Sequence, residues 1–191
     1  MRAVMKGQLL AGLGIFVGIL LWAGIILAQS AAPALSEELA AVRRALEKYQ
    51  DPIVAVRDGY FSTVGCVKYP TGGMGIHFLN VQLITPTPDP MRPTILLYEP
   101  VGDKLRLVGA EWFVPLATGV KERPSLFGQP FDGPMEGHEP LQPAQLHHYD
   151  LHVWLFKSNP AGLFNAVNPN VKCPKGRYSF MGQPPKTIPP R

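Results

Sequence analysis

Cysteine is scarce in this chain of 191 residues, since Cys66 and Cys173 are the only two. They lie far apart, and no CxxC pair supports the alternatives of a thiolate metal site or a dithiol redox couple. A single disulfide bond is therefore expected, provided that the chain reaches an oxidising compartment. It would close a loop of more than 100 residues and add about 4–5 kcal/mol to the free energy of unfolding.

Several enzyme signatures are also missing. There is no GxSxG elbow, which argues against a nucleophilic catalytic triad. The stretch GGMG at residues 72–75 lacks the P-loop lysine and the glycine spacing of dinucleotide-binding loops. The chain contains no internal repeat.

An excess of charge of one sign is lacking once the first 30 residues are set aside. These contain Arg2 and Lys6 but no acid, so the remainder has 16 basic and 14 acidic residues. This balance argues against nucleic acid as a partner. A protein partner in the cell envelope is compatible with it.

The N-terminal segment, residues 1–30, is typical of an export signal. Arg2 and Lys6 precede an uncharged apolar run over residues 9–28, and small residues just before Ala31 allow cleavage there. The run is also long enough to span a bilayer, so an uncleaved N-terminal membrane anchor is the alternative. No cysteine follows it directly for a lipoprotein anchor, and no twin arginine precedes it. Either version predicts an extracytoplasmic (secreted or periplasmic) location.

After a spacer at residues 31–35, the sequence predicts a short helical segment. Ser36 is a candidate N-cap followed by two glutamates, and four apolar residues then recur at helical spacing up to Tyr49. Asp51 and Pro52 favour a second short helix that closes at Gly59.

The following residues favour strands, because short apolar runs alternate with glycine and proline. Candidate strands are residues 61–67, 76–84, 94–98, 104–114 and 146–156, with a hairpin turn at 100–103 and a long surface loop over 115–145. We therefore expect one exported domain at residues 36–178 and a proline-rich flexible tail at 179–191. The predicted fold is mainly β, an antiparallel sandwich or open barrel with an N-terminal helical segment; α+β is the alternative.

Histidine is concentrated in HHYDLH, residues 147–152, which holds three of the five histidines. Valine and aromatic residues favour a strand here, in which His148, Asp150 and His152 share one face. Neighbours at i and i+2 can then converge on one ion, whereas His148 and His152 are too far apart to share one. A helix would instead make these two histidines a ligand pair.

Other ligands must come from elsewhere in the chain, and the candidates are His77, His138 and Glu111. Imidazole and carboxylate ligands suit zinc, copper or iron rather than calcium. We therefore expect an exported domain that binds a transition metal through this His/Asp face. The alternative is a non-enzymatic structural or interaction domain of the envelope, in which the same residues form a polar network or an exposed face. Two turn-rich segments, at 127–140 and 158–174, either route the chain toward Cys173 or rim a pocket beside the histidine face.

Five motifs resemble, in this order, an uncharacterised group of secreted bacterial proteins. The motifs are GGMGIHFLN, TILLYEP, LVGAEWFVP, LFGQPFDGPMEGHEP and HYDLHVWLFKSNPAGLFNAVNPNVKC. The resemblance covers residues 45–173 and implies a bacterial exported protein. It implies no activity, cofactor or catalytic residue.

Overall fold

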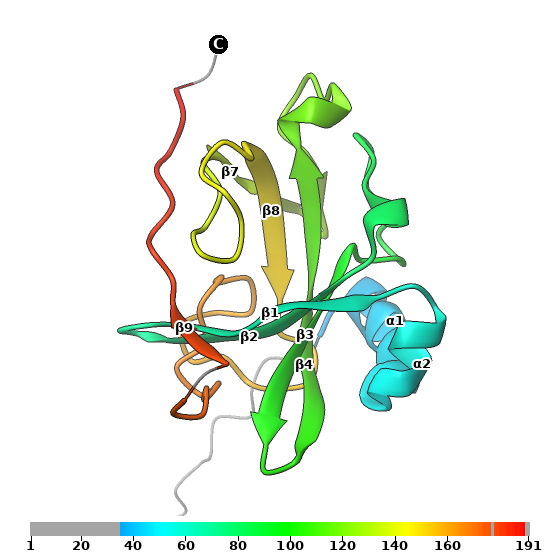
Figure 1. Ribbon diagram of the computed structural model, residues 1–191. Coiled ribbons are helices and arrows are strands. Elements are labelled where there is room, and N and C mark those ends of the chain that lie inside the picture. The colour runs from blue at the N-terminus through cyan, green and yellow to red at the C-terminus, as the bar shows by residue number, and fades with distance from the viewer. Residues whose placement is uncertain (1–34, 177, 190–191) are drawn as a thin grey trace, which may run out of the picture. The chain divides into compact units, whose positions relative to one another are not determined.

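The computed structural model describes residues 35–176 and 178–189, apart from the side chain of Val64. The predicted export segment and nearly all of the spacer lie outside the described residues. Residues from Leu35 onward form one compact unit, and the predicted mainly β fold is confirmed (Figure 1). The elements are α1 (Glu37–Leu46), the 3-10 helix η1 (Glu47–Gln50), α2 (Pro52–Arg57), β1 (Phe61–Tyr69), β2 (Gly72–Leu79), η2 (Val81–Leu83), β3 (Ile95–Val101), β4 (Lys104–Pro115), η3 (Leu116–Thr118), β5 (Ser125–Leu126), β6 (Gln129–Pro130), β7 (Asp132–Met135), β8 (His148–Val153) and β9 (Ser179–Met181).

The two helices begin at the predicted N-caps. The Ser36 hydroxyl accepts a hydrogen bond from the Leu39 amide at 3.3 Å, and the Asp51 carboxylate accepts one from the Ile53 amide at 2.9 Å. Such bonds satisfy amides that have no partner within the helix. The predicted apolar stripe, which includes Val42 and Tyr49, is buried against the sheet. In the described part of the chain, no helix has the length and apolar character needed to cross a membrane.

Seven strands form one curled sheet, a half-barrel, in the order β7-β8-β4-β3-β2-β1-β9. Neighbouring strands are antiparallel except β1 and β9, which are parallel. Figure 1 shows β8 beside the long strand β4, with β1 and β2 running across them at the other side of the sheet. The predicted strand over residues 146–156 is therefore β8, and the helical alternative for HHYDLH is wrong.

The two faces of the sheet pack against different parts of the chain. One face carries Leu96, Trp112 and Leu151 and packs against the helices. The other face carries Ile95 and Phe113, which belong to a smaller apolar cluster. Residues directly opposite one another in neighbouring strands share a face, so the register places the candidate ligands on this second face, away from the helices.

Cys66 and Cys173 form the predicted disulfide bond. It joins β1 to the end of the loop that follows β8, across 107 residues of sequence.

Two expectations about irregular segments need correction. Residues 115–145 are not a long surface loop, because they include the β5–β6 hairpin and strand β7 and bury Phe131 completely. The segment 179–191, expected to be a flexible tail, contributes β9 to the sheet and pairs Thr187 with Met135. Proline removes amide donors locally, but three amides still bond between the two segments, those of Glu136, Gln183 and Ile188.

Candidate metal centre

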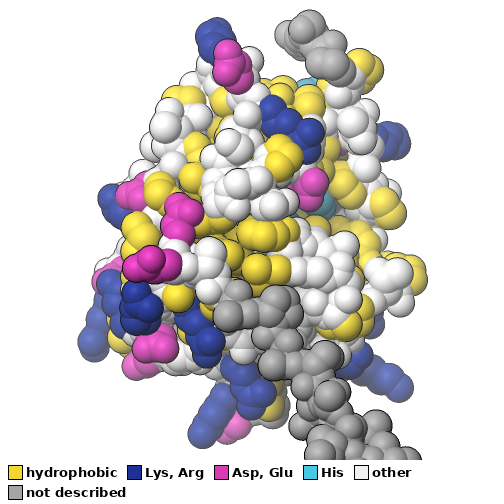
Figure 2. Space-filling model, turned by 180° about the vertical axis from the view of Figure 1, so that it is seen from behind, with side chains coloured by type: hydrophobic (Ala, Val, Ile, Leu, Met, Phe, Trp, Pro, Cys, Tyr) yellow, Lys and Arg dark blue, Asp and Glu magenta, His cyan; other side chains and the backbone are white. Residues whose placement is uncertain are grey.

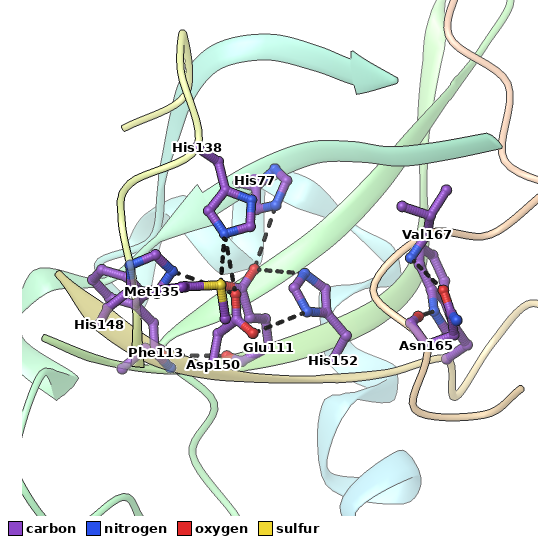
Figure 3. Close-up of polar contacts among 12 residues, drawn as sticks. His77, Glu111, Phe113, Met135, His138, His148, Asp150, His152, Asn165 and Val167 are labelled. Carbon is purple, nitrogen blue, oxygen red and sulfur yellow. Dashed lines mark hydrogen bonds and ion pairs between the residues drawn. The ribbon is translucent and has the colours of Figure 1, made fainter. Parts of the chain in front are cut away.

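All six predicted ligands lie in one buried cluster (Figure 3). Three strands and one loop supply them, and every side chain is at most 6% exposed. The cluster divides into two groups, each with its ligand atoms within 4.8 Å of one another. We call them the Glu111 triad (His77, Glu111, His152) and the Asp150 triad (His138, His148, Asp150).

The Glu111 triad follows from the register of β2, β3, β4 and β8. Glu111 on β4 stands opposite His152 on β8 and opposite Ile95 on β3, while His77 lies on β2, the next strand. The Nε2 atoms of His77 and His152 approach the same carboxylate oxygen of Glu111, Oε2, at 3.3 and 3.2 Å. Two imidazoles and one carboxylate oxygen therefore converge from three strands.

Despite these short distances, the N–H directions of the two rings are not aligned with the carboxylate for hydrogen bonding. Glu111 Oε2 and both ring nitrogens of His77 and of His152 are buried without a hydrogen-bond partner. Glu99, a second buried acid of the same sheet, is different. Its carboxylate accepts bonds from Lys157 Nζ at 2.7 and 2.6 Å and from the Lys172 amide at 2.9 Å. The carboxylate of Glu99 therefore has hydrogen-bond donors, whereas Oε2 of Glu111 has none.

The Asp150 triad is built around Oδ2 of Asp150. The Nε2 atoms of His148 and His138 lie 3.5 and 3.7 Å from this oxygen. His148 Nδ1 lies 3.0 Å from the carbonyl oxygen of Leu146. A carbonyl only accepts, so Nδ1 carries a hydrogen, and a ring without a second hydrogen would present the Nε2 lone pair toward Asp150. A backbone carbonyl behind one ring nitrogen is how proteins commonly orient a histidine that binds metal through the other.

The two triads adjoin each other along β8. His152 Nδ1 lies 3.9 Å from Asp150 Oδ1, the oxygen that does not face the other histidines. His148 and His152 belong to different triads, as expected from their separation on a strand. The predicted single strand face is confirmed, but it serves two groups of ligands, and its burial rules out the exposed-face alternative.

Unsatisfied polar atoms are concentrated in this cluster. Within the described part of the chain, nine buried side-chain nitrogen or oxygen atoms lack a hydrogen-bond partner, and seven of them belong to the two triads. The seven are His77 Nδ1 and Nε2, Glu111 Oε2, His148 Nε2, Asp150 Oδ1, and His152 Nδ1 and Nε2. A buried polar atom that nothing compensates costs about 1–3 kcal/mol. Six of the seven lie 3.2–3.9 Å from an imidazole nitrogen or carboxylate oxygen, so a proton or another cation shared within the cluster would offset much of this cost.

The surroundings shift the pKa values of the two histidines His152 and His138 in opposite directions. Burial tends to lower the pKa of His152, but the adjacent Glu111 carboxylate outweighs it and raises the pKa to about 9. Burial alone would raise the pKa of Glu111, yet His152 and His77 hold it well below its usual range. For His138, burial dominates and lowers the pKa to about 4. A positive charge beside Glu111 is thus favoured, and a proton on His152 supplies one.

A tight loop brings His138 over the sheet. The Gly137 amide donates to the Ala144 carbonyl at 3.1 Å, and the Gln142 amide donates to the His138 carbonyl at 2.9 Å. A Cβ atom at Gly137 would overlap the Pro143 carbonyl oxygen. Glycine is therefore required where the loop closes on itself.

The Asp150 triad opens into a cavity of about 520 Å³, here called the Met135 cavity. Met135 lines it beside His138 and Asp150, and Tyr69 and Met74 also contribute to its wall. The two turn-rich segments both line it, one through residues 132, 133, 135 and 138 and the other through residues 166 and 167, as their pocket alternative predicted. The Glu111 triad contacts a different cavity of about 140 Å³, the Gln142 cavity, through His77. Figure 2 agrees with the burial of the cluster, since very little histidine surface is visible on that side.

Two residues of the site were not predicted. Met135 Sδ lies 3.3 Å from His138 Nε2, and the Tyr69 hydroxyl lies 3.3 Å from His138 Nδ1. Neither belongs to the histidine-rich stretch, and only the long-range folding of β1 and β7 brings them to it. Met135 stands opposite His148 in the β7–β8 register.

Comparison with known proteins adds no functional assignment, because the chain matches no protein-family model, no curated protein and no solved structure.

Proposed function

We propose that this domain binds two transition-metal ions, one at each triad, in an extracytoplasmic compartment. The observation that carries the proposal is that buried ligand atoms converge on two points, the first at Glu111 Oε2 and the second at Asp150 Oδ2. Four of the six converging atoms have no hydrogen-bond partner: His77 Nε2, Glu111 Oε2, His152 Nε2 and His148 Nε2. A metal ion at each point would use the lone pairs that face one another and would relieve their desolvation.

The charge of the cluster supports the same proposal. Glu111 and Asp150 are two carboxylates in an interior from which water is largely removed, and an unpaired buried carboxylate is strongly disfavoured. Metal cations between the imidazoles would compensate both. Imidazole and carboxylate donors suit zinc, copper or iron. Where a coordination position stays open, such an ion can activate water.

The proposed location rests on the expected export segment and is supported by the disulfide bond. Disulfides persist in secreted and periplasmic proteins and are rare in the cytosol. Fractionation of a bacterial host that expresses the full chain tests it. Recovery of the oxidised protein in the periplasmic, secreted or membrane fraction is expected, and reduced protein in the cytosol would contradict it.

A second function has one observation in its favour. The histidines already lie within 3.2–3.9 Å of carboxylate oxygens, as they would in a purely structural ion-pair network of an envelope interaction domain. In that case each imidazole would be held by its proton, and no metal would be taken up.

Metal analysis of the full chain, purified without a polyhistidine tag, separates the two. We expect about two equivalents of zinc, copper or iron by ICP-MS, or the uptake of two equivalents of added zinc. The double variant His148→Ala, His152→Ala is expected to lose both. His147→Ala is the matched control, because His147 is the one histidine outside the cluster. A folded protein that holds no metal and takes up none would overturn the proposal.

A further inference from the structure

The two triads differ in their donor atoms, and we infer that the Asp150 triad prefers copper(I), with Met135 as a ligand, whereas the Glu111 triad prefers zinc. When zinc is the only metal supplied, it can occupy both triads. This inference rests on the proposed function and assigns a different metal to each of its two sites.

Met135 is buried beside the Asp150 triad. It is 6% exposed and ends β7, directly opposite His148 on β8. Its Sδ atom lies 3.3 Å from Nε2 of His138, the nitrogen that also faces Asp150. Figure 3 shows the sulfur among the side chains of the Asp150 triad. The sulfur therefore adjoins the Asp150 triad at His138 Nε2, one of the three atoms that converge there.

The chemistry of these donors differs between the triads. Thioether sulfur is a soft ligand that selects copper(I), whereas zinc is bound by imidazole, carboxylate and thiolate. No sulfur belongs to the Glu111 triad, whose two histidines and one glutamate are a donor set that zinc uses in proteins. Both cysteines are joined in the disulfide bond, so methionine is the remaining source of sulfur for a metal.

Tyr69 can set the protonation of His138 for this role. Its hydroxyl oxygen lies 3.3 Å from His138 Nδ1. When the hydroxyl accepts the hydrogen of Nδ1, Nε2 is left with a lone pair directed toward Met135 and Asp150. When the hydroxyl donates instead, Nε2–H faces the sulfur and Met135 is only a packing partner. Copper(I) can bind Nε2 only in the first arrangement. If Met135 is a ligand, copper(I) affinity depends on its sulfur; if Met135 is only a packing partner, it does not.

The Asp150 triad is also the more accessible of the two. His138, Asp150 and Met135 all line the Met135 cavity of about 520 Å³. The wall of this cavity is largely apolar, with Met74 as a second buried methionine. An ion delivered from a small carrier molecule can therefore reach the sulfur and the two imidazoles through this cavity.

Competition for copper(I) tests the assignment. The full chain, without a polyhistidine tag and with the disulfide intact, is titrated with copper(I) in ascorbate under anaerobic conditions against the chelator bicinchoninate. Wild type, Met135→Leu and Met74→Leu are compared, because leucine keeps the approximate volume of methionine. Met74→Leu is the matched control, since it removes a thioether from the same cavity but not from the triad. Zinc uptake is measured on the same samples.

We expect Met135→Leu to weaken copper(I) binding about ten- to a hundredfold, in the range of changes at a metal site, while zinc at the Glu111 triad and copper(I) in Met74→Leu stay as in wild type. X-ray absorption of the copper(I) protein should show a sulfur neighbour that is lost in Met135→Leu. Equal copper(I) affinity in wild type and Met135→Leu, with zinc still bound, would overturn this inference and leave the proposed function intact. Binding of neither metal to wild type would overturn both.

Discussion

Glu111 and His152 face each other across β4 and β8, with 3.2 Å between Oε2 and Nε2, yet neither atom has a hydrogen-bond partner. Both side chains are almost completely buried. Close approach without hydrogen-bond geometry is what two ligands of one ion would show, because each directs its lone pair at the ion rather than at the other.

Replacement of Glu111 by glutamine tests this relationship. The amide keeps the shape of the carboxylate but removes the charge that compensates a metal ion or a protonated His152. Zinc uptake should fall from two equivalents to one, as measured by ICP-MS. The metal-free variant should also lose about 3–5 kcal/mol of unfolding free energy in urea, since it leaves a buried charge without its partner. Two equivalents of zinc in the variant would show that Glu111 is not a ligand.

The stability of the metal-free protein should be greatest near pH 6.5. The pKa of His152 is raised from 6.5 to about 9, so its contribution is complete below pH 6.5 and is lost as the pH rises toward 9. The pKa of His138 is lowered from 6.5 to about 4, so the unfolded chain takes up a proton first and stability falls as the pH decreases from 6.5 to 4. The lowered pKa of Glu111 adds a further loss below 4.5. Urea midpoints at pH 5, 6.5 and 9 test this, and a steady rise up to pH 9 would contradict it.

Zinc affinity should depend on pH over an unusual range. His152 must release its proton to bind metal, and its pKa is about 9 rather than 6.5. The apparent affinity of the Glu111 triad should therefore rise about tenfold per pH unit between pH 7 and 8.5. Zinc titration against a chelator of known affinity measures the slope. A zinc affinity that is constant above pH 7 would mean that zinc binding does not release a proton from an imidazole with a raised pKa.

Gly137→Ala should affect the Asp150 triad alone. The added methyl group would overlap the Pro143 carbonyl, so the loop that carries His138 must open. We expect one zinc equivalent to bind at least tenfold more weakly, in the range seen for altered metal surroundings, and the other to bind unchanged. Gly102→Ala is the control for a strained glycine substitution away from the site. Its φ of +62° disfavours a side chain, but the methyl group meets nothing within 4 Å, so a modest loss of stability with both zinc equivalents unchanged is expected. Loss of both equivalents in Gly137→Ala would show instead that the triads are not independent.

Much of the fold was accessible from local patterns. Ser36 and Asp51 begin the helices because each can accept a hydrogen bond from an exposed amide, and that property belongs to the residue itself. The alternation within HHYDLH also placed His148, Asp150 and His152 on one face, since side chains alternate along any strand.

The division into two triads was not accessible in this way. It depends on the register between β2, β3, β4 and β8, which brings His77 and Glu111 beside His152 from distant parts of the sequence. The place of Met135 depends on a segment whose amides bond to the C-terminal residues, as the Glu136 amide does to the Lys186 carbonyl at 3.0 Å. Such pairings are set by tertiary contacts, and proline-rich segments carry no periodic pattern that would reveal them.

Anomalous X-ray diffraction from crystals of the full chain soaked in zinc, recorded above and below the zinc absorption edge, tests the central claim most directly. The two-site account predicts two anomalous peaks, one among His77, Glu111 and His152 and one among His138, His148 and Asp150. The absence of a peak at either triad, with the imidazoles hydrogen-bonded to the carboxylates instead, would contradict it and identify the cluster as a structural ion-pair network.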